Sequence, residues 1–139
     1  MVSSTTSREI VRRAREQLED WKFDARDRAY TELFEGANAV LTDEELRLLD
    51  HIDSDLTRQG ESGLWGADDY GIVVGGGLEA EEAQVVCTYH PEIPYEGYRG
   101  ERSLSESTRE ELNDVFWDYC ERVAAFIQED LDAFLRSTA

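Results

Sequence analysis

The feature that most constrains the fold is the last third of the chain, which predicts one long helix over residues 108–136. Ser107 with Glu110, or Thr108 with Glu111, would cap its start. Its apolar residues form a main stripe and a second row: Leu112, Val115, Phe116, Tyr119, Val123, Phe126 and Phe134, then Trp117, Cys120, Ala124, Ile127, Leu131 and Leu135. Together they cover roughly half of the circumference, more than the ~100° stripe of an ordinary surface helix. Such a helix has to contact two layers, either helices and a hairpin or a second subunit.

The N-terminal part of the chain predicts helices, beginning with one over residues 5–20. Its apolar stripe consists of Ile10, Ala14, Leu18 and Trp21. Beyond this stripe the apolar direction drifts, so we expect the helix to break near residues 21–24 and Asp24 to cap a second helix.

The next helix has the clearest local start in the sequence. Thr42 and Glu45 have the spacing of a capping box, in which each residue bonds the backbone N–H of the other. Gly60 supplies a stop signal. This pattern predicts a helix over about residues 43–59.

Two β-branched runs follow, YGIVV at residues 70–74 and AQVVCTY at residues 83–89. The glycine-bearing stretch GGGLEAEE separates them, which predicts an antiparallel hairpin with a flexible loop. A lone hairpin is marginal in water, so it needs a helix or further strands. Residues 95–104 could add a third short strand.

The order of helices, then strands, then one helix favours an α+β fold over an alternating α/β fold. We expect helices packed around the long C-terminal helix, with one antiparallel hairpin covering part of it. The length suits a single domain over residues 1–139. Within it we expect a helical part at 5–60, the hairpin and a connector at 61–104, and the long helix at 105–137.

The charge balance is the strongest signal about the setting in which the protein works. The chain has 32 acidic and 14 basic residues, a net charge of −18, and Lys22 as its single lysine. Self-repulsion on this scale is muted at 1 M salt, where the Debye length falls to roughly 3 Å. The composition therefore resembles that of proteins from salt-in halophilic archaea, although it identifies no family. The alternative is an acidic mesophilic protein, such as a nucleic-acid mimic or a binder of basic partners.

Other compositional signals predict a compact cytoplasmic protein. With 40% hydrophobic residues the chain is too apolar for a disordered protein. No apolar run approaches the roughly 20 residues of a membrane helix, and the first residues lack the apolar core of a signal peptide. We expect no membrane partner, and we expect Cys87 and Cys120 to be free thiols.

The connector HPEIPYEGYRGER, residues 90–102, is the first candidate for a binding site. Its prolines and glycines are explained by a tie between the hairpin and the last helix. Packing alone does not require its other side chains, so the candidate binding residues are His90, Glu92, Tyr95, Tyr98, Arg99 and Arg102. In an enzyme, His90 would be a general acid or base, Glu92 would orient it, and Arg99 or Arg102 would hold an anion.

Motifs for phosphate, metal and nucleophile chemistry are weak. The glycines at 75–77 are followed by acidic residues and a strand, whereas a P-loop continues with lysine and a helix. Cys87 and His90 converge on a metal only if the strand ends or bulges between them. We therefore expect no metal and no cofactor, and we assign no catalytic residue.

The first predicted helix carries a candidate basic strip made of Arg8, Arg12 and Arg15. Such a strip could bind phosphate or nucleic acid. The alternative is that Glu16 and Glu19, four residues after Arg12 and Arg15, pair with them along a solvated face.

Asp130 falls in the middle of the main apolar stripe of the last helix. If it is buried, it needs an arginine or another hydrogen-bonding partner. An arginine from the first helix would make the pair structural. The alternative is that the core ends near Ile127 and Asp130 is wet.

Three hypotheses about function follow. The first is a non-enzymatic interaction or regulatory module that binds a protein partner, with a homodimer through Trp117, Leu131 and Leu135 as one form. The second is a small enzyme or ligand binder with its pocket at the connector. The third is nucleic-acid association through the N-terminal arginines. The net charge neither excludes nucleic acid nor indicates a basic ligand, because high salt screens it.

Overall fold

The computed structural model describes residues 4–36, 39–58, 60, 63–74, 83–91, 93 and 106–138. They form α1 (Ser4–Phe34), α2 (Asp43–Arg58), β1 (Asp69–Val73), β2 (Gln84–Tyr89) and α3 (Glu106–Thr138). The predicted α+β class, with a long C-terminal helix and an antiparallel hairpin, is confirmed.

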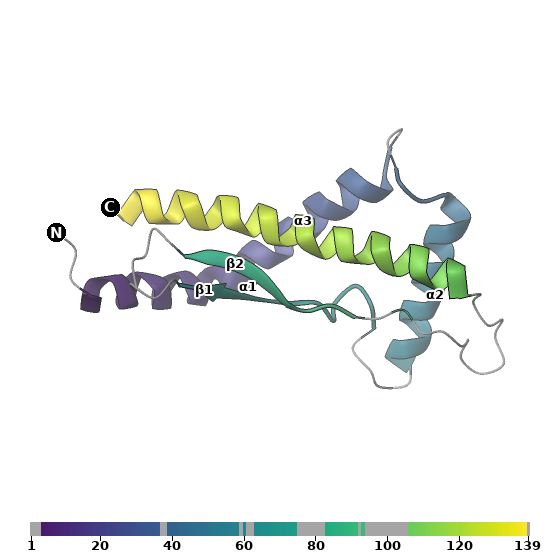
Figure 1. Ribbon diagram of the computed structural model, residues 1–139, viewed down its shortest axis with the longest axis horizontal. Helices are drawn as coiled ribbons and strands as arrows, with labels where there is room; N and C mark the ends of the chain where they lie inside the picture. Colours follow the sequence, from purple (N-terminus) through teal and green to yellow (C-terminus); the bar gives the residue numbers. More distant parts are fainter. Residues whose placement is uncertain are drawn as a thin grey trace.

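The two long helices, α1 and α3, pack against each other and run in opposite directions (Figure 1). Near one end of the pair, Trp21 meets Phe134 edge-on with 5.7 Å between ring centroids. Near the other end, Phe34 stacks on Tyr119 at 6.0 Å. Residues that come later in α1 therefore meet residues that come earlier in α3, as antiparallel packing requires.

The predicted break in the first helix is wrong. α1 continues through residues 21–24, and Asp24 is an exposed residue inside the helix. The buried stripe passes through Lys22 and Ala25 at this point. Lys22 is 9% exposed because its aliphatic stem is buried, while its Nζ reaches Glu19 at 2.9 Å. A lysine and an alanine give little apolar signal in a sequence, which is why the stripe could not be followed there.

The capping box of α2 is confirmed. The Thr42 N–H donates to Glu45 Oε1 at 3.0 Å, and the Glu45 N–H donates to Thr42 Oγ1 at 3.1 Å. After the helix, Gly60 has a φ of 85°, the left-handed conformation common after helix ends. α2 lies at the end of the helix pair where α1 ends and α3 begins (Figure 1).

β1 and β2 form the predicted antiparallel hairpin. Tyr70 pairs with Cys87 and Ile72 pairs with Val85, with a register irregularity at the start of β1. The third strand predicted at residues 95–104 lies outside the described residues.

Side chains from the two long helices bond both outer edges of the hairpin. Arg15 Nη2 of α1 donates to the carbonyl oxygen of Ile72 at 2.8 Å. Gln128 of α3 accepts from the Val85 N–H at 2.7 Å and donates to the carbonyl oxygen of Ala83 at 3.3 Å. A two-stranded sheet has unpaired backbone groups on both edges, so these bonds fix the hairpin to the helices.

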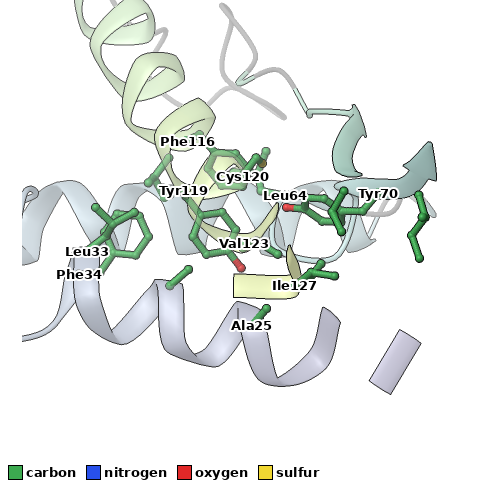
Figure 2. Close-up of a cluster of buried hydrophobic side chains, with 14 of the residues drawn as sticks. Ala25, Leu33, Phe34, Leu64, Tyr70, Phe116, Tyr119, Cys120, Val123 and Ile127 are labelled. Atoms are coloured by element: carbon green, nitrogen blue, oxygen red, sulfur yellow. The ribbon is translucent and has the colours of Figure 1, made fainter. Parts of the chain in front are cut away.

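The core fills the space between the helices and the hairpin (Figure 2). Its buried side chains include Leu33 of α1, Leu49 of α2, Ile72 of β1, Val85 of β2, and Phe116 and Ile127 of α3. α3 contacts both α1 and β2, the two layers that its wide apolar arc predicted. Among the described helices, none is long and apolar enough to cross a membrane.

Candidate functional site

A hollow of about 420 Å³ lies where α1, α3 and the turn at residues 63–67 meet. Its lining consists of Phe23, Arg26, Asp27, Tyr30, Trp65 and Tyr119. The first four come from α1 at spacings of three, four and seven residues, which share one face of a helix. We call this hollow the aromatic depression, because most of its lining is aromatic.

Trp65 stands nearly perpendicular to two other rings of the aromatic depression, those of Tyr30 and Tyr119. The ring centroids of Tyr30 and Trp65 lie 5.3 Å apart with 73° between the planes. Those of Trp65 and Tyr119 lie 5.5 Å apart with 82° between the planes. Edge-to-face pairs of this kind are favourable, so the rings support one another as walls. Figure 2 shows the hydroxyl of Tyr119 directed toward α1.

Trp65 is held in place by carboxylates of α2. Asp53 Oδ1 accepts from the N–H of Leu64 at 2.7 Å and from the N–H of Trp65 at 3.2 Å. The indole Nε1 of Trp65 donates to Asp50 Oδ1 at 2.9 Å. Gly63 has a φ of 77°, and a Cβ there would lie 2.5 Å from Asp53 Oδ1. A glycine is therefore needed at this position to bring the turn so close to α2.

Phe23 forms the exposed rim of the aromatic depression. Its side chain is 75% exposed, although phenylalanine is one of the residues most often buried. Folding gains little from an apolar ring in this position. A ligand or partner that covered it would gain apolar burial.

Arg26 joins the aromatic depression to a buried ion pair. Its Nη2 donates to Asp68 Oδ1 at 2.8 Å and to the Asp68 carbonyl oxygen at 2.9 Å. The side chain of Asp68 is fully buried, and its Oδ2 accepts from the hydroxyl of Tyr70 at 2.6 Å. The positive charge of Arg26 is thus balanced inside the protein, and the pair ties α1 to the start of the hairpin.

Burial keeps the neighbouring hydroxyl and thiol groups protonated. It raises the pKa of Tyr70, and the carboxylate of Asp68 raises that pKa further. The pKa values of Tyr119 and Cys120 are raised by the same two causes. Burial also raises the pKa of Cys87. At neutral pH these four groups therefore supply neither a thiolate nor a phenolate nucleophile.

Carboxylates dominate the charge around the aromatic depression. Asp27 belongs to its lining. Burial raises the pKa of Tyr30, and the negative charges of Asp50 and Glu35 raise it further, which places both carboxylates within electrostatic reach of that hydroxyl. Because Arg26 is balanced by its ion pair, the surplus charge at the depression is negative.

Comparison with known protein families assigns nearly the whole chain to one family. The chain belongs to DUF7539, a family of unknown function. The family match spans residues 4–138, from the start of α1 to the end of α3. No curated protein matches the chain, and no solved structure matches it.

A second hollow in this DUF7539 chain, of about 430 Å³, lies beside the first. Its lining consists of Asp27, Arg28, Thr31, Glu32 and Phe126. The guanidinium carbon of Arg28 lies 4.1 Å from the ring centroid of Phe126, and Arg28 Nη2 contacts Glu129 Oε2 at 3.1 Å. The protein's own arginine therefore occupies the face of Phe126, the one ring among the described residues of this lining.

Most of the predicted connector site lies outside the described part of the DUF7539 chain: Glu92, Tyr95, Tyr98, Arg99 and Arg102. His90 is described and half-buried, and its ring meets Trp117 edge-on at 4.7 Å. A binding role for the connector stays a prediction. Both cysteines are free thiols, as expected. Within the described ranges, no group of three or more His, Cys, Asp or Glu side chains is placed to hold a metal ion.

The members of the predicted basic strip have different environments. Arg8 is exposed. Arg12 Nη1 donates to Glu16 Oε1 at 2.8 Å, the pairing that the alternative interpretation predicted. Arg15 donates to the backbone of β1 instead of pairing with Glu19. Two of the three guanidinium groups are thus engaged within the chain, and a role in nucleic-acid binding stays a prediction.

The three predicted interface residues of α3 differ in exposure. Trp117 is 44% exposed, Leu135 is half-buried, and Leu131 is fully buried. Leu131 is therefore covered by the chain itself, and of the three only Trp117 presents a large exposed apolar surface. A homodimer through this face stays a prediction.

Asp130 is half-buried, and the idea that the core ends near Ile127 is wrong because Leu131 is fully buried. Burial raises the pKa of Asp130, as does the negative charge of Asp24. The nearby guanidinium of Arg28 acts in the opposite direction. Arg28 forms its ion pair with Glu129, so a structural pair between Asp130 and an arginine of the first helix stays a prediction.

Sequence reasoning missed the aromatic depression. Trp65 lies in the glycine-rich stretch ESGLWGADDYG, which predicts only turns, and Phe23 lies where a helix break is predicted. The signal that could have drawn attention is a tryptophan between two glycines with two aspartates after it, because loops often carry functional side chains. The ring partners of Trp65 all lie far from it in the sequence: Tyr30, Phe34, Phe116 and Tyr119.

Proposed function

We propose that the protein is a non-enzymatic binding module and that its binding site is the aromatic depression. One observation carries the proposal: an exposed phenylalanine, Phe23, borders a hollow of about 420 Å³ whose other rings are fixed in place. Hollows of about 300–1,000 Å³ with aromatic linings and a few polar groups are typical of ligand sites.

The chemistry next to the hollow favours binding over catalysis. Raised pKa values keep Tyr119 and Cys120 protonated. Asp68 already accepts hydrogen bonds from Arg26 and Tyr70, and a general base needs a free lone pair directed at its substrate. What faces a ligand is aromatic surface with carboxylates around it.

The function is tested by NMR on the ¹⁵N-labelled full chain with a library of small organic fragments in molar KCl. We expect binders to shift the indole N–H signal of Trp65 before those of Trp21 and Trp117. Tyr30→Ala should abolish these shifts, whereas the matched control Trp117→Ala should not. Binders that act only on Trp117, or the absence of binders, would contradict the proposal.

We also propose that the protein works in the salt-rich cytoplasm of a halophile. The net charge of −18 supports this, because self-repulsion of this size is tolerated best at high ionic strength. The only lysine, Lys22, is 9% exposed, so nearly all of the positive charge at the surface is carried by arginine.

A circular dichroism titration with KCl tests this setting. We expect the helical signal to be lost at low salt, where the carboxylates repel one another unscreened, and to return at molar KCl. A matched series in sucrose would separate charge screening from general stabilisation of the compact state. Full folding without added salt would refute the halophile proposal.

A further inference from the structure

We infer that the aromatic depression selects a small organic cation that carries a quaternary ammonium group. The inference rests on the proposed binding function and adds the class of ligand. It combines three features of the depression: rings set at steep angles to Trp65, surplus negative charge, and an arginine whose own charge is already balanced.

The rings provide the surface that such a cation needs. A cation is attracted to the face of an aromatic ring within about 6 Å of the centroid, and tryptophan gives the strongest attraction. Tyr30 and Trp65 meet at 73°, so their faces point in different directions at the hollow. Tyr119 is 2% exposed and stacks on Phe34, so it closes the base of the hollow. A ligand inside contacts Tyr30 and Trp65 at once, and the exposed ring of Phe23 can close over it from the rim.

The carboxylates around the hollow repel an anionic ligand. Asp27 lines the hollow, Asp50 accepts the indole hydrogen of Trp65, and Glu35 lies within electrostatic reach of Tyr30. Among the described residues of the lining, the one cationic side chain is that of Arg26, which is held by the buried Asp68 and is not free to bind an anionic ligand. Contacts inside the hollow are also screened less by salt than charges on an open surface.

The hydrogen-bonding groups favour a methylated ammonium over a primary one. A primary ammonium has three N–H donors that need acceptors once water is removed, whereas a quaternary ammonium has none. Asp50 and Asp68 already accept from Trp65 and Arg26, so of these carboxylates Asp27 is left to accept from a ligand, one group for three donors. Methyl groups on the ligand nitrogen pack directly on the ring faces that remain.

The test compares choline with 3,3-dimethyl-1-butanol, which has the same shape with carbon in place of the charged nitrogen. Dissociation constants are measured in molar KCl from the Trp65 indole N–H signal of the full chain. We expect choline to bind about tenfold more tightly than its neutral counterpart, the size of effect that cation–π contacts give.

Two charge variants on α1 locate the effect. Asp27→Asn should weaken choline binding about threefold and leave the neutral compound unchanged, because it removes one carboxylate from the lining. Glu9→Gln is the matched control: it makes the same change of charge on the same helix, on a side chain that is 62% exposed, about 27 Å from Asp27 along the helix axis. It should alter neither constant.

The outcomes separate this inference from the proposed function. If the neutral compound binds as tightly as choline, or Asp27→Asn has no effect, the inferred class of ligand is wrong. The proposed binding function is not affected by that result. If neither compound shifts Trp65 although other fragments do, the class is again wrong. If no fragment of any kind binds at Trp65, the proposed function and the inference both fall.

Discussion

The hairpin and the aromatic depression both lie against α1, but side chains of different kinds contact them. At the hairpin, Arg15 and Gln128 bond backbone groups on the two outer edges. At the depression, ordered rings and the 75% exposed Phe23 leave a hollow. Arg26 belongs to both regions, since it lines the hollow and holds Asp68. The difference teaches that polar side chains on the helices secure the fold at the hairpin, while aromatic side chains provide a surface for binding.

The largest effect should come from the ion pair that joins the two regions. Asp68→Ala leaves the guanidinium of Arg26 without its buried partner, which should lower the free energy of unfolding by about 3–5 kcal/mol. Urea denaturation at constant molar KCl measures the loss. Asp69→Ala, at the exposed neighbouring position, is the control and should change stability by less than about 0.5 kcal/mol. Equal effects of the two substitutions would show that the ion pair does not secure the hairpin.

Two phenylalanines of α1 separate folding from binding. Phe34 is 5% exposed, so Phe34→Ala should lower the free energy of unfolding by about 3 kcal/mol. Phe23→Ala should lower it by less than about 0.5 kcal/mol and still weaken the shift of the Trp65 signal by choline. Thermal unfolding in KCl and the NMR titration measure the two effects. A large loss of stability in Phe23→Ala would mean that this ring serves the fold.

Removing one edge bond tests how the hairpin is held. Gln128→Leu keeps the size of the side chain but leaves the Val85 N–H without its acceptor, which should cost about 1–3 kcal/mol. Gln84→Leu, on the exposed side of β2, is the matched control and should be nearly neutral. Hydrogen exchange at Val85 reports the same effect locally. Unchanged exchange in Gln128→Leu would contradict the role of this bond.

The smallest effect concerns Asp130, whose folded pKa is raised above its ordinary value of 3.8. The native state then holds the proton at pH values where the unfolded chain has lost it, so the contribution of Asp130 to stability falls as pH rises through this window. Asp130→Asn should therefore stabilise the protein at pH 7, by less than about 0.5 kcal/mol because solvent screens a group that is only half-buried. The gain should vanish near pH 3, where the carboxyl group is protonated in both states. Urea denaturation at the two pH values measures it, and an equal gain at both would contradict the assignment.

The elements with local signals were predicted correctly from the sequence. The capping box of Thr42 and Glu45 forms as its spacing indicates, because both bonds join residues three positions apart. The hairpin and α3 follow from β-branched runs and from a wide apolar arc. The first helix was predicted with a break because Lys22 counts as polar in a sequence, whereas the folded protein buries its stem.

The candidate site could not be predicted in the same way. Trp65 becomes a wall of the hollow only because Asp50 and Asp53 of α2 hold its turn, and because Tyr30 and Tyr119 come from two other helices. These contacts join residues far apart in the sequence, so no spacing pattern predicts them.

The sequence by itself determined the α+β class, the bounds of α2, the hairpin strands and α3 to within about two residues, and a net charge of −18. These properties depend on hydrogen bonds and side-chain periodicity within short segments, or on composition alone. Only the tertiary structure decided that Lys22 is buried, that Arg26 is balanced by Asp68, and that Phe23 stands exposed at the rim of an aromatic hollow. Each of these depends on which side chains distant segments bring together, and burial and charge balance are properties of that packing.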